Sequence, residues 1–101
     1  MDIQKLMEQA RQMQDNLGRI EEELNATEYE GKAGGNDVKV VVNGRNEVQS
    51  VEIADDLMTV DNKEMLQDLI LIAVNEAVEK AFQDRENKLG SATSGLNLPG
   101  M

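Results

Sequence analysis

The first 25 residues carry a strict heptad pattern, and this pattern constrains the fold more than any other feature of the chain. Apolar residues recur at alternating steps of three and four, at Ile3, Leu6, Ala10, Met13, Leu17, Ile20 and Leu24. This spacing places them on one narrow stripe of an α-helix, the seam typical of a coiled coil. Met1 to Asn25 is therefore predicted to form a helix that packs on a second helix, from this chain or from another copy.

Three local features refine this helix. Asp2 precedes the periodic residues and is its expected N-cap. Gly18 lies mid-helix, where glycine costs about 1 kcal/mol relative to alanine; we interpret it as a tolerated surface glycine, with a bend or a close helix approach as the alternative. The run Glu21-Glu22-Glu23 lies towards the C-terminal end, where the helix dipole disfavours negative charge, and we expect a solvated face there.

After Ala26 the apolar residues alternate, which indicates β-strands. Residues 27–31 predict a short edge strand, the β-branched run 37–42 predicts the clearest strand, and residues 47–53 predict a third. Asn43-Gly44-Arg45-Asn46 is predicted to be a hairpin turn in which Asn-Gly supplies the positive φ angles. The three strands are expected to form an antiparallel sheet.

The length of the hairpin loop determines which residues face one another. A four-residue loop places Val38 opposite Val51, Val40 opposite Gln49 and Val42 opposite Glu47, whereas a two-residue turn shifts the register by a whole pair. The apolar face of the sheet then holds Val38, Val40, Val42, Val51 and Ile53. Three short strands with one apolar face need a helix or another sheet as cover.

The second half of the chain predicts that cover. Asp61 followed by Glu64 is a capping-box pattern, so a second helix is expected to begin there and to end at Gly90. Apolar residues run almost unbroken from Leu69 to Val74, which indicates burial both on the sheet and against a partner copy. The candidate core and dimer contacts are Leu69, Ile70, Ala73, Val74 and Ala77.

These elements predict an α+β protein of order α-β-β-β-α. Residues 1–89 are expected to form a single domain and residues 90–101 a flexible C-terminal tail. Aromatic residues are only 2% of the chain, so its own core is modest and oligomerisation is a natural way to bury more surface.

The residue types argue against catalysis. The chain has no cysteine and no histidine, which excludes disulfides, thiolate metal sites and the commonest general base. Asp55-Asp56 and Asp61 lack a known metal-ligand spacing, and Gly31, Gly34 and Gly35 match no phosphate loop. We expect no enzyme activity, cofactor, metal site or small-molecule substrate; a carboxylate- or metal-dependent hydrolase is the weakest alternative.

Charge and hydropathy bound the partners. No apolar run approaches the 18 residues of a membrane helix, and the N-terminus lacks the basic region of a signal peptide, so we expect a soluble cytoplasmic protein without a membrane partner. Ten basic and twenty acidic residues give a formal net charge of −10, which repels polyanions. Most basic residues have an acidic neighbour at helical distance, so the basic residues taken by themselves indicate an ion-paired, solvated surface.

Six stretches, taken in order, resemble the YbaB/EbfC family of bacterial nucleoid-associated proteins. Leu-Met-Glu-Gln-Ala-Arg-Gln-Met-Gln at 6–14 is similar to the family's opening helix. The strand sequences at 38–44 and 48–53, the helix sequences at 63–70 and 73–77, and Ser-Gly-Leu-Asn-Leu-Pro-Gly at 94–100 follow in the family's order. Each motif is weak by itself, but their order and spacing cover essentially the whole chain.

The resemblance implies a tight homodimer whose long helices project like tweezers. It also implies double-stranded DNA binding with little sequence specificity, in the cytoplasm or nucleoid, with an influence on nucleoid organisation and gene expression. Matching positions make Lys5, Arg11, Arg19, Lys80, Arg85 and Lys88 the candidates for phosphate contact. A dimer would carry a formal charge of −20, so the contact must come from a locally positive strip.

A second hypothesis does without DNA. The chain would then be an acidic protein–protein interaction module that uses its N-terminal helix or its C-terminal tail to dock a protein partner.

Overall fold

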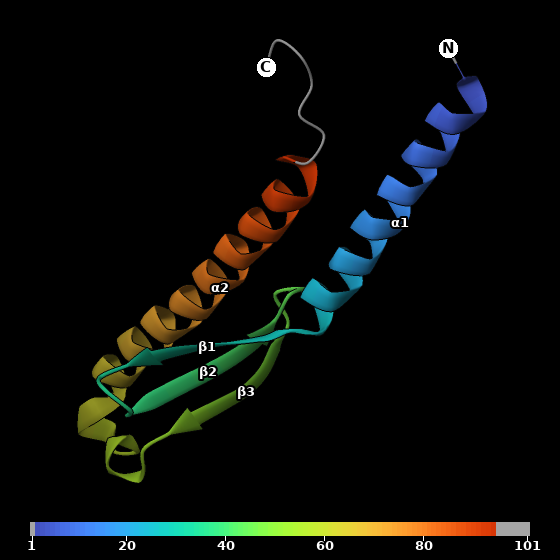
Figure 1. Cartoon of the computed structure of the whole chain (residues 1–101). Coiled ribbons are helices and arrows are strands. Elements are labelled where there is room, and N and C mark those ends of the chain that lie inside the picture. Colours follow the sequence, from blue (N-terminus) through green and yellow to red (C-terminus); the bar gives the residue numbers. More distant parts are fainter. Residues whose placement is uncertain (1, 95–101) are drawn as a thin grey trace.

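The computed structural model describes residues 2–94, and its elements follow in the order α-β-β-β-α (Figure 1). Helix α1 spans Ile3–Ala26 and helix α2 spans Lys63–Ser94. Between them lie β1 (Glu28–Ala33), β2 (Val38–Asn43) and β3 (Val48–Ile53), followed by two short 3-10 turns at Asp55–Leu57 and Val60–Asn62. The expected element order is therefore confirmed.

Helix α1 packs along only part of its heptad seam. Asp2 caps its N-terminus as expected, because the carboxylate accepts the Lys5 backbone N–H at 3.3 Å. Leu24 is fully buried, whereas Ile3 and Leu6 at the other end are 68% and 50% exposed. The helix that faces the inner part of the seam is α2 of the same chain, since Ile20 lines a groove between the two helices.

The strands form an antiparallel sheet in the order β1-β2-β3, but the expected register of the hairpin is wrong. Val38 lies opposite Ile53, Val40 opposite Val51 and Val42 opposite Val48. The physical reason is that the Asn43 N–H donates to the Glu47 backbone oxygen at 3.0 Å, so that only the three residues 44–46 form the hairpin loop, and that a bulge lies beside Val42.

The bulge keeps the apolar residues on one face. Partners across a ladder point to the same side of a sheet, so Val51 and Ile53 share the face of Val40 and Val38 as expected. The observed pairing differs from the expected one by two residues along β3, and a shift by two leaves each side chain on the same face of the sheet. The extra residue of the bulge places Val48 on this face as well.

The expected source of positive φ in the hairpin is also wrong. Asn46 adopts the left-handed conformation with φ 63°, not Asn43 or Gly44. Gly44 is required for a different reason: a Cβ there would lie 1.8 Å from the backbone oxygen of Leu24. The hairpin therefore abuts the C-terminal end of α1.

Small residues let α2 lie directly on β1. Ala73, Ala77 and Ala81 are buried, and a Cβ on Gly31 would lie 1.9 Å from the carbonyl oxygen of Ala73. The buried valines of β2 complete this core, with Leu57 at its edge. Among the candidate core and dimer residues, Ala73 and Ala77 lie inside it, and Leu69, Ile70 and Val74 pack on it half-buried.

Both expected ends of α2 are corrected by the structure. Asp61 lies inside the turn Val60–Asn62, so the helix begins at Lys63 and Asp61 is not its N-cap. The helix continues through Gly90 to Ser94, because Gly90 keeps a helical conformation and does not terminate the helix. The remainder of the expected tail, residues 95–101, lies outside the described residues.

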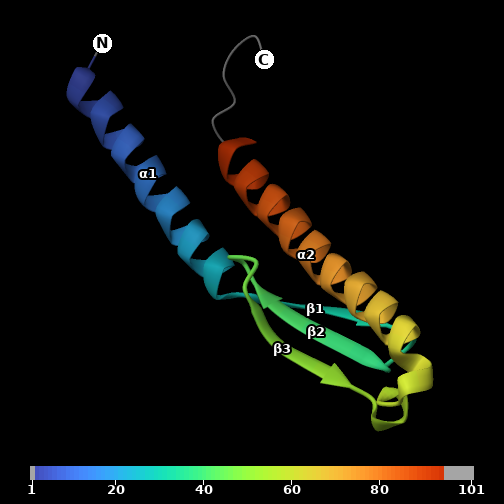
Figure 2. The same ribbon diagram turned by 180° about the vertical axis from the view of Figure 1, so that it is seen from behind.

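The sheet is covered unequally. Helix α2 packs on β1 and β2, while β3 lies beyond it (Figures 1 and 2). Val48 and Val51 are consequently 51% and 46% exposed although they share the core face of β2. Leu71 and Phe82 of α2 are exposed as well. One apolar face of the described protomer is thus left open.

Candidate nucleic-acid interface

Helix α1 and the outer half of α2 project from the sheet in the same direction (Figures 1 and 2). The protomer is accordingly elongated, with extents of 72 × 26 × 15 Å. The two helices touch through an Arg85–Glu21 ion pair of 2.9 Å. We call the two helical segments together the two-helix arm and define it as residues 2–26 and 80–94. A tweezer-like arrangement of the kind expected for the homodimer therefore requires one such arm from each of two protomers.

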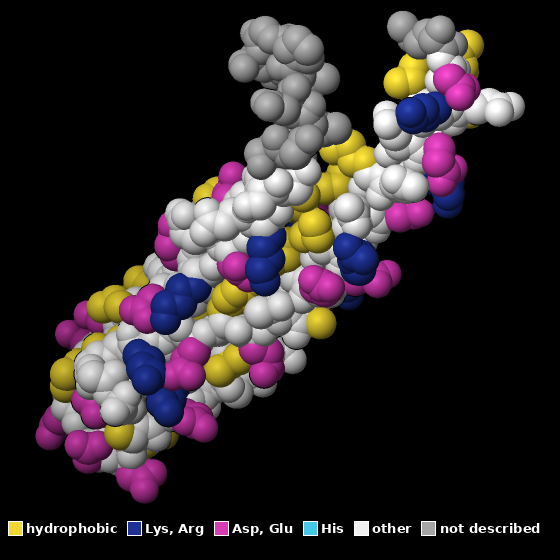
Figure 3. Space-filling view, in the orientation of Figure 1, with side chains coloured by type: hydrophobic (Ala, Val, Ile, Leu, Met, Phe, Trp, Pro, Cys, Tyr) yellow, Lys and Arg dark blue, Asp and Glu magenta, His cyan; other side chains and the backbone are white. Residues whose placement is uncertain are grey.

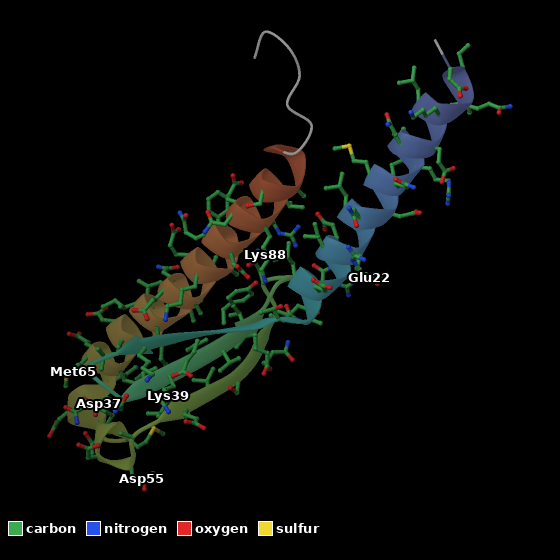
Figure 4. The ribbon with its side chains drawn as sticks, in the orientation of Figure 1. Glu22, Asp37, Lys39, Asp55, Met65 and Lys88 are labelled. Carbon is green, nitrogen blue, oxygen red and sulfur yellow. The ribbon has the colours of Figure 1, made fainter. Side chains whose placement is uncertain are left out.

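Charge is divided between the arm and the rest of the molecule. The arm holds six of the ten basic residues and eight of the twenty acidic ones. The remainder holds four basic and twelve acidic residues. Asp37 and Asp55 lie at the end of the sheet remote from the arm, whereas Lys88 lies on α2 beside α1 (Figure 4). Most of the negative net charge thus belongs to the body, with a formal charge of −8, whereas the arm carries a formal charge of −2.

The basic side chains on α1 are exposed and bonded locally. Arg11 is 63% exposed and pairs with both Glu8 and Asp15. The hydrogen bond to Glu8, and then the charge of Asp15, raise the pKa of the Arg11 guanidinium. Arg19 donates to the Asn16 side-chain oxygen at 2.6 Å, and Lys5 is exposed near the tip.

The basic side chains on α2 divide into two kinds. Lys80 and Lys88 are exposed and pair along the helix, with Glu76 at 3.3 Å and Asp84 at 3.2 Å. Lys80 also donates to the backbone oxygen of Glu30 on β1 at 2.8 Å. Arg85 is turned inwards between the two helices and is bonded to α1 and to the hairpin.

The structure thus brings five of the six candidates onto one arm as exposed cations and places Arg85 inside it. Figure 3 shows Lys and Arg side chains along the arm interspersed with Asp and Glu, and apolar side chains between the helices. The open groove between α1 and α2 has a volume of about 480 Å³ and includes Lys88 and Glu23 in its lining. The cations form a broken strip and do not merge into one patch.

A buried tyrosine anchors the middle of α2 to the sheet. The Tyr29 hydroxyl donates to the Asp84 carboxylate at 2.6 Å. Burial first, and then this bond, raise the pKa of Tyr29 to about 12. The same bond, followed by Lys88, lowers the pKa of Asp84. Asp84 therefore holds Lys88 in place on one side while it holds β1 on the other.

Sequence reasoning missed Tyr29, Asp84, Glu21 and Asn25 as parts of this region. The signal for Glu21 was present, because the acidic run near the end of α1 has no basic residue in the same turn to balance it. That run was expected to be solvated throughout, but Glu21 is bonded to Arg85. The Tyr29–Asp84 bond spans 55 residues of sequence, and no local pattern indicates it.

Within residues 2–94, no helix is long and apolar enough to cross a membrane. The same described part of the chain contains no group of three or more His, Cys, Asp or Glu side chains placed to hold a metal ion.

Comparison with known proteins connects this geometry to a family. The model of the YbaB/EbfC DNA-binding family matches residues 1–96. A nucleoid-associated protein of Pelotomaculum thermopropionicum is 44% identical over 100 residues, which are 99% of this chain and 95% of that protein. One from Clostridium novyi is 43% identical over 101 residues, 100% of this chain and 89% of that protein.

The fold also has a counterpart among solved structures. The crystal structure of an uncharacterized protein from Helicobacter pylori matches with a TM-score of 0.75 at 27% sequence identity. The match covers 90% of this chain and 96% of that one. The overall fold is therefore shared with an experimentally determined structure.

Proposed function

Because this chain belongs to the YbaB/EbfC DNA-binding family, we propose that it is a nucleoid-associated protein that binds duplex DNA through its two-helix arm. The observation that supports this proposal is the division of charge, which gives the arm six of the ten basic residues and a formal charge of −2, compared with −8 for the rest of the chain. A polyanion is repelled most strongly by the body, where exposed cations such as Lys32, Arg45 and Lys63 are outnumbered threefold by acidic residues, and least by the arm.

The chemistry is an exchange of partners. Arg11 and Lys88 are paired with carboxylates at the surface, where such pairs contribute about 0 to 1 kcal/mol. Replacing a carboxylate by a phosphate oxygen costs little and releases counterions from the duplex. Contacts to phosphate oxygens carry no direct sequence information, so binding of this kind has little sequence specificity.

The working form in this proposal is a homodimer. The open apolar face of β3 and α2 is suited to a second copy, because burying Val48, Val51 and Phe82 removes them from water. A dimer presents two arms, each with Lys5, Arg11 and Arg19 on α1 and Lys80 and Lys88 on α2. We infer that these five side chains contact phosphates and that the protein acts in the nucleoid by occupying or bridging DNA, without a catalytic step.

The test compares two variants that change the net charge equally. The arm variant combines Lys5→Gln, Arg11→Gln and Arg19→Gln, and its matched control combines Lys32→Gln, Lys39→Gln and Lys63→Gln in the body. Fluorescence anisotropy with a labelled duplex at low salt measures the Kd. The arm variant is expected to bind at least about tenfold more weakly than wild type, since charged hydrogen bonds are lost.

The control is expected to lose much less affinity, because its three lysines lie outside the arm. An equal loss in both variants would show that the net charge matters and the arm does not, and would contradict the assignment of the interface. A wild-type protein that binds no duplex in this assay would contradict the function itself.

A further inference from the structure

Helix α1 is held to the rest of the molecule by few contacts. Leu24 is its only buried residue, and a single residue, Thr27, separates its end from β1. Its last turns contain Glu21, Glu22 and Glu23 and no basic residue. Negative charge at a helix C-terminus is unfavourable, so this end of α1 needs a cation from elsewhere.

Arg85 of α2 supplies that cation. Its Nη1 donates to the Glu21 carboxylate at 2.9 Å, and its Nη2 donates to the Asn25 side-chain oxygen at 3.1 Å. Nη2 also lies 3.3 Å from the backbone oxygen of Gly44, which accepts from it. One guanidinium thus bonds α1 at two positions and the hairpin at a third.

The surroundings of Arg85 differ from those of the other cations. Its side chain is 30% exposed, compared with 63% for Arg11. The planar guanidinium suits three acceptors held in fixed directions, which an ammonium group does not match. Turning it outwards to a phosphate would break three bonds at once and leave Glu21 without its partner.

We propose that Arg85 is a positioning residue: it fixes α1 against α2 and so sets the shape of the DNA-binding arm, and it does not itself contact phosphate. This inference rests on the proposed function for its effect on DNA, while its effect on the arm is independent of DNA. The Arg85 side chain replaces, from another helix, the basic residue that the last turn of α1 lacks.

Glu21→Gln gives the sharpest test because the two roles predict opposite signs. If Arg85 contacted phosphate, removing its competitor Glu21 would free the guanidinium and reduce repulsion, and DNA affinity would rise. For a positioning residue, the loosened arm binds more weakly, by roughly fivefold, in the range observed when coupled elements are perturbed. Glu22→Gln is the matched control, since it removes the same charge from the neighbouring, exposed position.

Arg85→Lys provides a second variant with the charge retained. A lysine can still contact a phosphate, so a phosphate contact predicts little loss of affinity. A positioning role predicts a loss close to that of Glu21→Gln, because an ammonium does not bridge the three acceptors. Nearly unchanged binding by Arg85→Lys, or tighter binding by Glu21→Gln than by Glu22→Gln, would overturn the proposal.

The arm itself is measured without DNA. The chain has no native cysteine, so Gln12→Cys on α1 and Glu86→Cys on α2 can carry spin labels uniquely. Labelled chains are diluted into unlabelled protein, and pulsed electron-spin resonance gives the distance distribution between the helices within one protomer. Arg85→Lys and Glu21→Gln are expected to broaden it, and Glu22→Gln to leave it unchanged.

The two readouts separate the possible failures. Unchanged distance distributions in Arg85→Lys and Glu21→Gln would overturn the positioning role, whatever happens to DNA. Broadened distributions in a wild-type background that binds no DNA would support the positioning of α1 while contradicting the proposed function.

Discussion

Two glycines of this chain lie in opposite surroundings at the scale of single residues. Gly31 faces the backbone of α2, where an added Cβ would lie 1.9 Å from the Ala73 backbone oxygen. A Cβ added to Gly18 would have no neighbouring atom within 4 Å. Gly31→Ala is expected to lower the free energy of unfolding by about 2 to 4 kcal/mol, because α2 must move away from β1. Gly18→Ala is expected to raise it by about 1 kcal/mol.

Urea unfolding at one fixed protein concentration measures both variants, with each serving as the control for the other. Gly18→Ala also distinguishes between the two interpretations of this mid-helix glycine. An increase in stability agrees with a tolerated surface glycine, whereas a loss would indicate that another helix approaches this position closely.

Tyr29 is the only tyrosine of the chain, so its ionisation can be followed directly by ultraviolet absorbance. We expect it to titrate near pH 12 in the folded protein and near 10 in denaturant. Between these values the unfolded chain has lost a proton that the native chain retains, so stability falls as the pH rises from 10 to 12. Below pH 10 this contribution is fully present.

Tyr29→Phe removes that pH dependence and is expected to cost about 1.5 kcal/mol at neutral pH, since the Asp84 carboxylate loses a donor. The lowered pKa of Asp84 acts at the other end of the scale: its contribution is present above the unfolded pKa and is lost as the pH falls through the folded one. A native titration of Tyr29 near pH 10 would show that the buried bond to Asp84 does not form.

At the scale of elements, the open face of β3 predicts the oligomeric state. Val51→Asp places a charge in the proposed dimer contact, and Ser50→Asp places it on the opposite side of the same strand. Sedimentation is expected to give twice the 11.2 kDa chain mass for wild type and Ser50→Asp, and the single chain mass for Val51→Asp. Dimers that persist in Val51→Asp would place the contact elsewhere.

The elements themselves were predictable because their signals are local. The heptads of α1, the β-branched run of β2 and the small and apolar residues of α2 each indicate one element type. The hairpin register was not predictable, since it depends on a three-residue loop, a left-handed Asn46 and a bulge that the sequence does not mark. The end at Gly90 was misplaced because glycine permits a helix end without requiring one.

The candidate site was predictable only in outline. Resemblance to a family identified the cations on both helices, and five of them are exposed on the arm. Arg85 differs because its acceptors lie 41 to 64 residues away along the chain, so only the folded structure shows that its side chain is already occupied.

At the scale of the whole molecule, an acidic protein can bind DNA only if its charge is unevenly distributed. In the proposed binding mode the body repels the duplex and the arm cations contact it, so electrostatics would orient the protein before any contact forms. Phosphate contacts release counterions, and binding of this kind must weaken steeply as salt is added.

The most direct measurement is therefore the Kd of the wild-type protein for duplex DNA across a salt series. Phosphate contacts by the arm predict that the logarithm of the association constant, 1/Kd, falls linearly with the logarithm of the salt concentration, with a slope of about −0.9 for each phosphate contacted. The arm variant is expected to have a shallower slope than the matched body control. Binding that does not change with salt, or no binding at about 50 mM salt, where phosphate contacts are strongest, would contradict DNA binding by the arm.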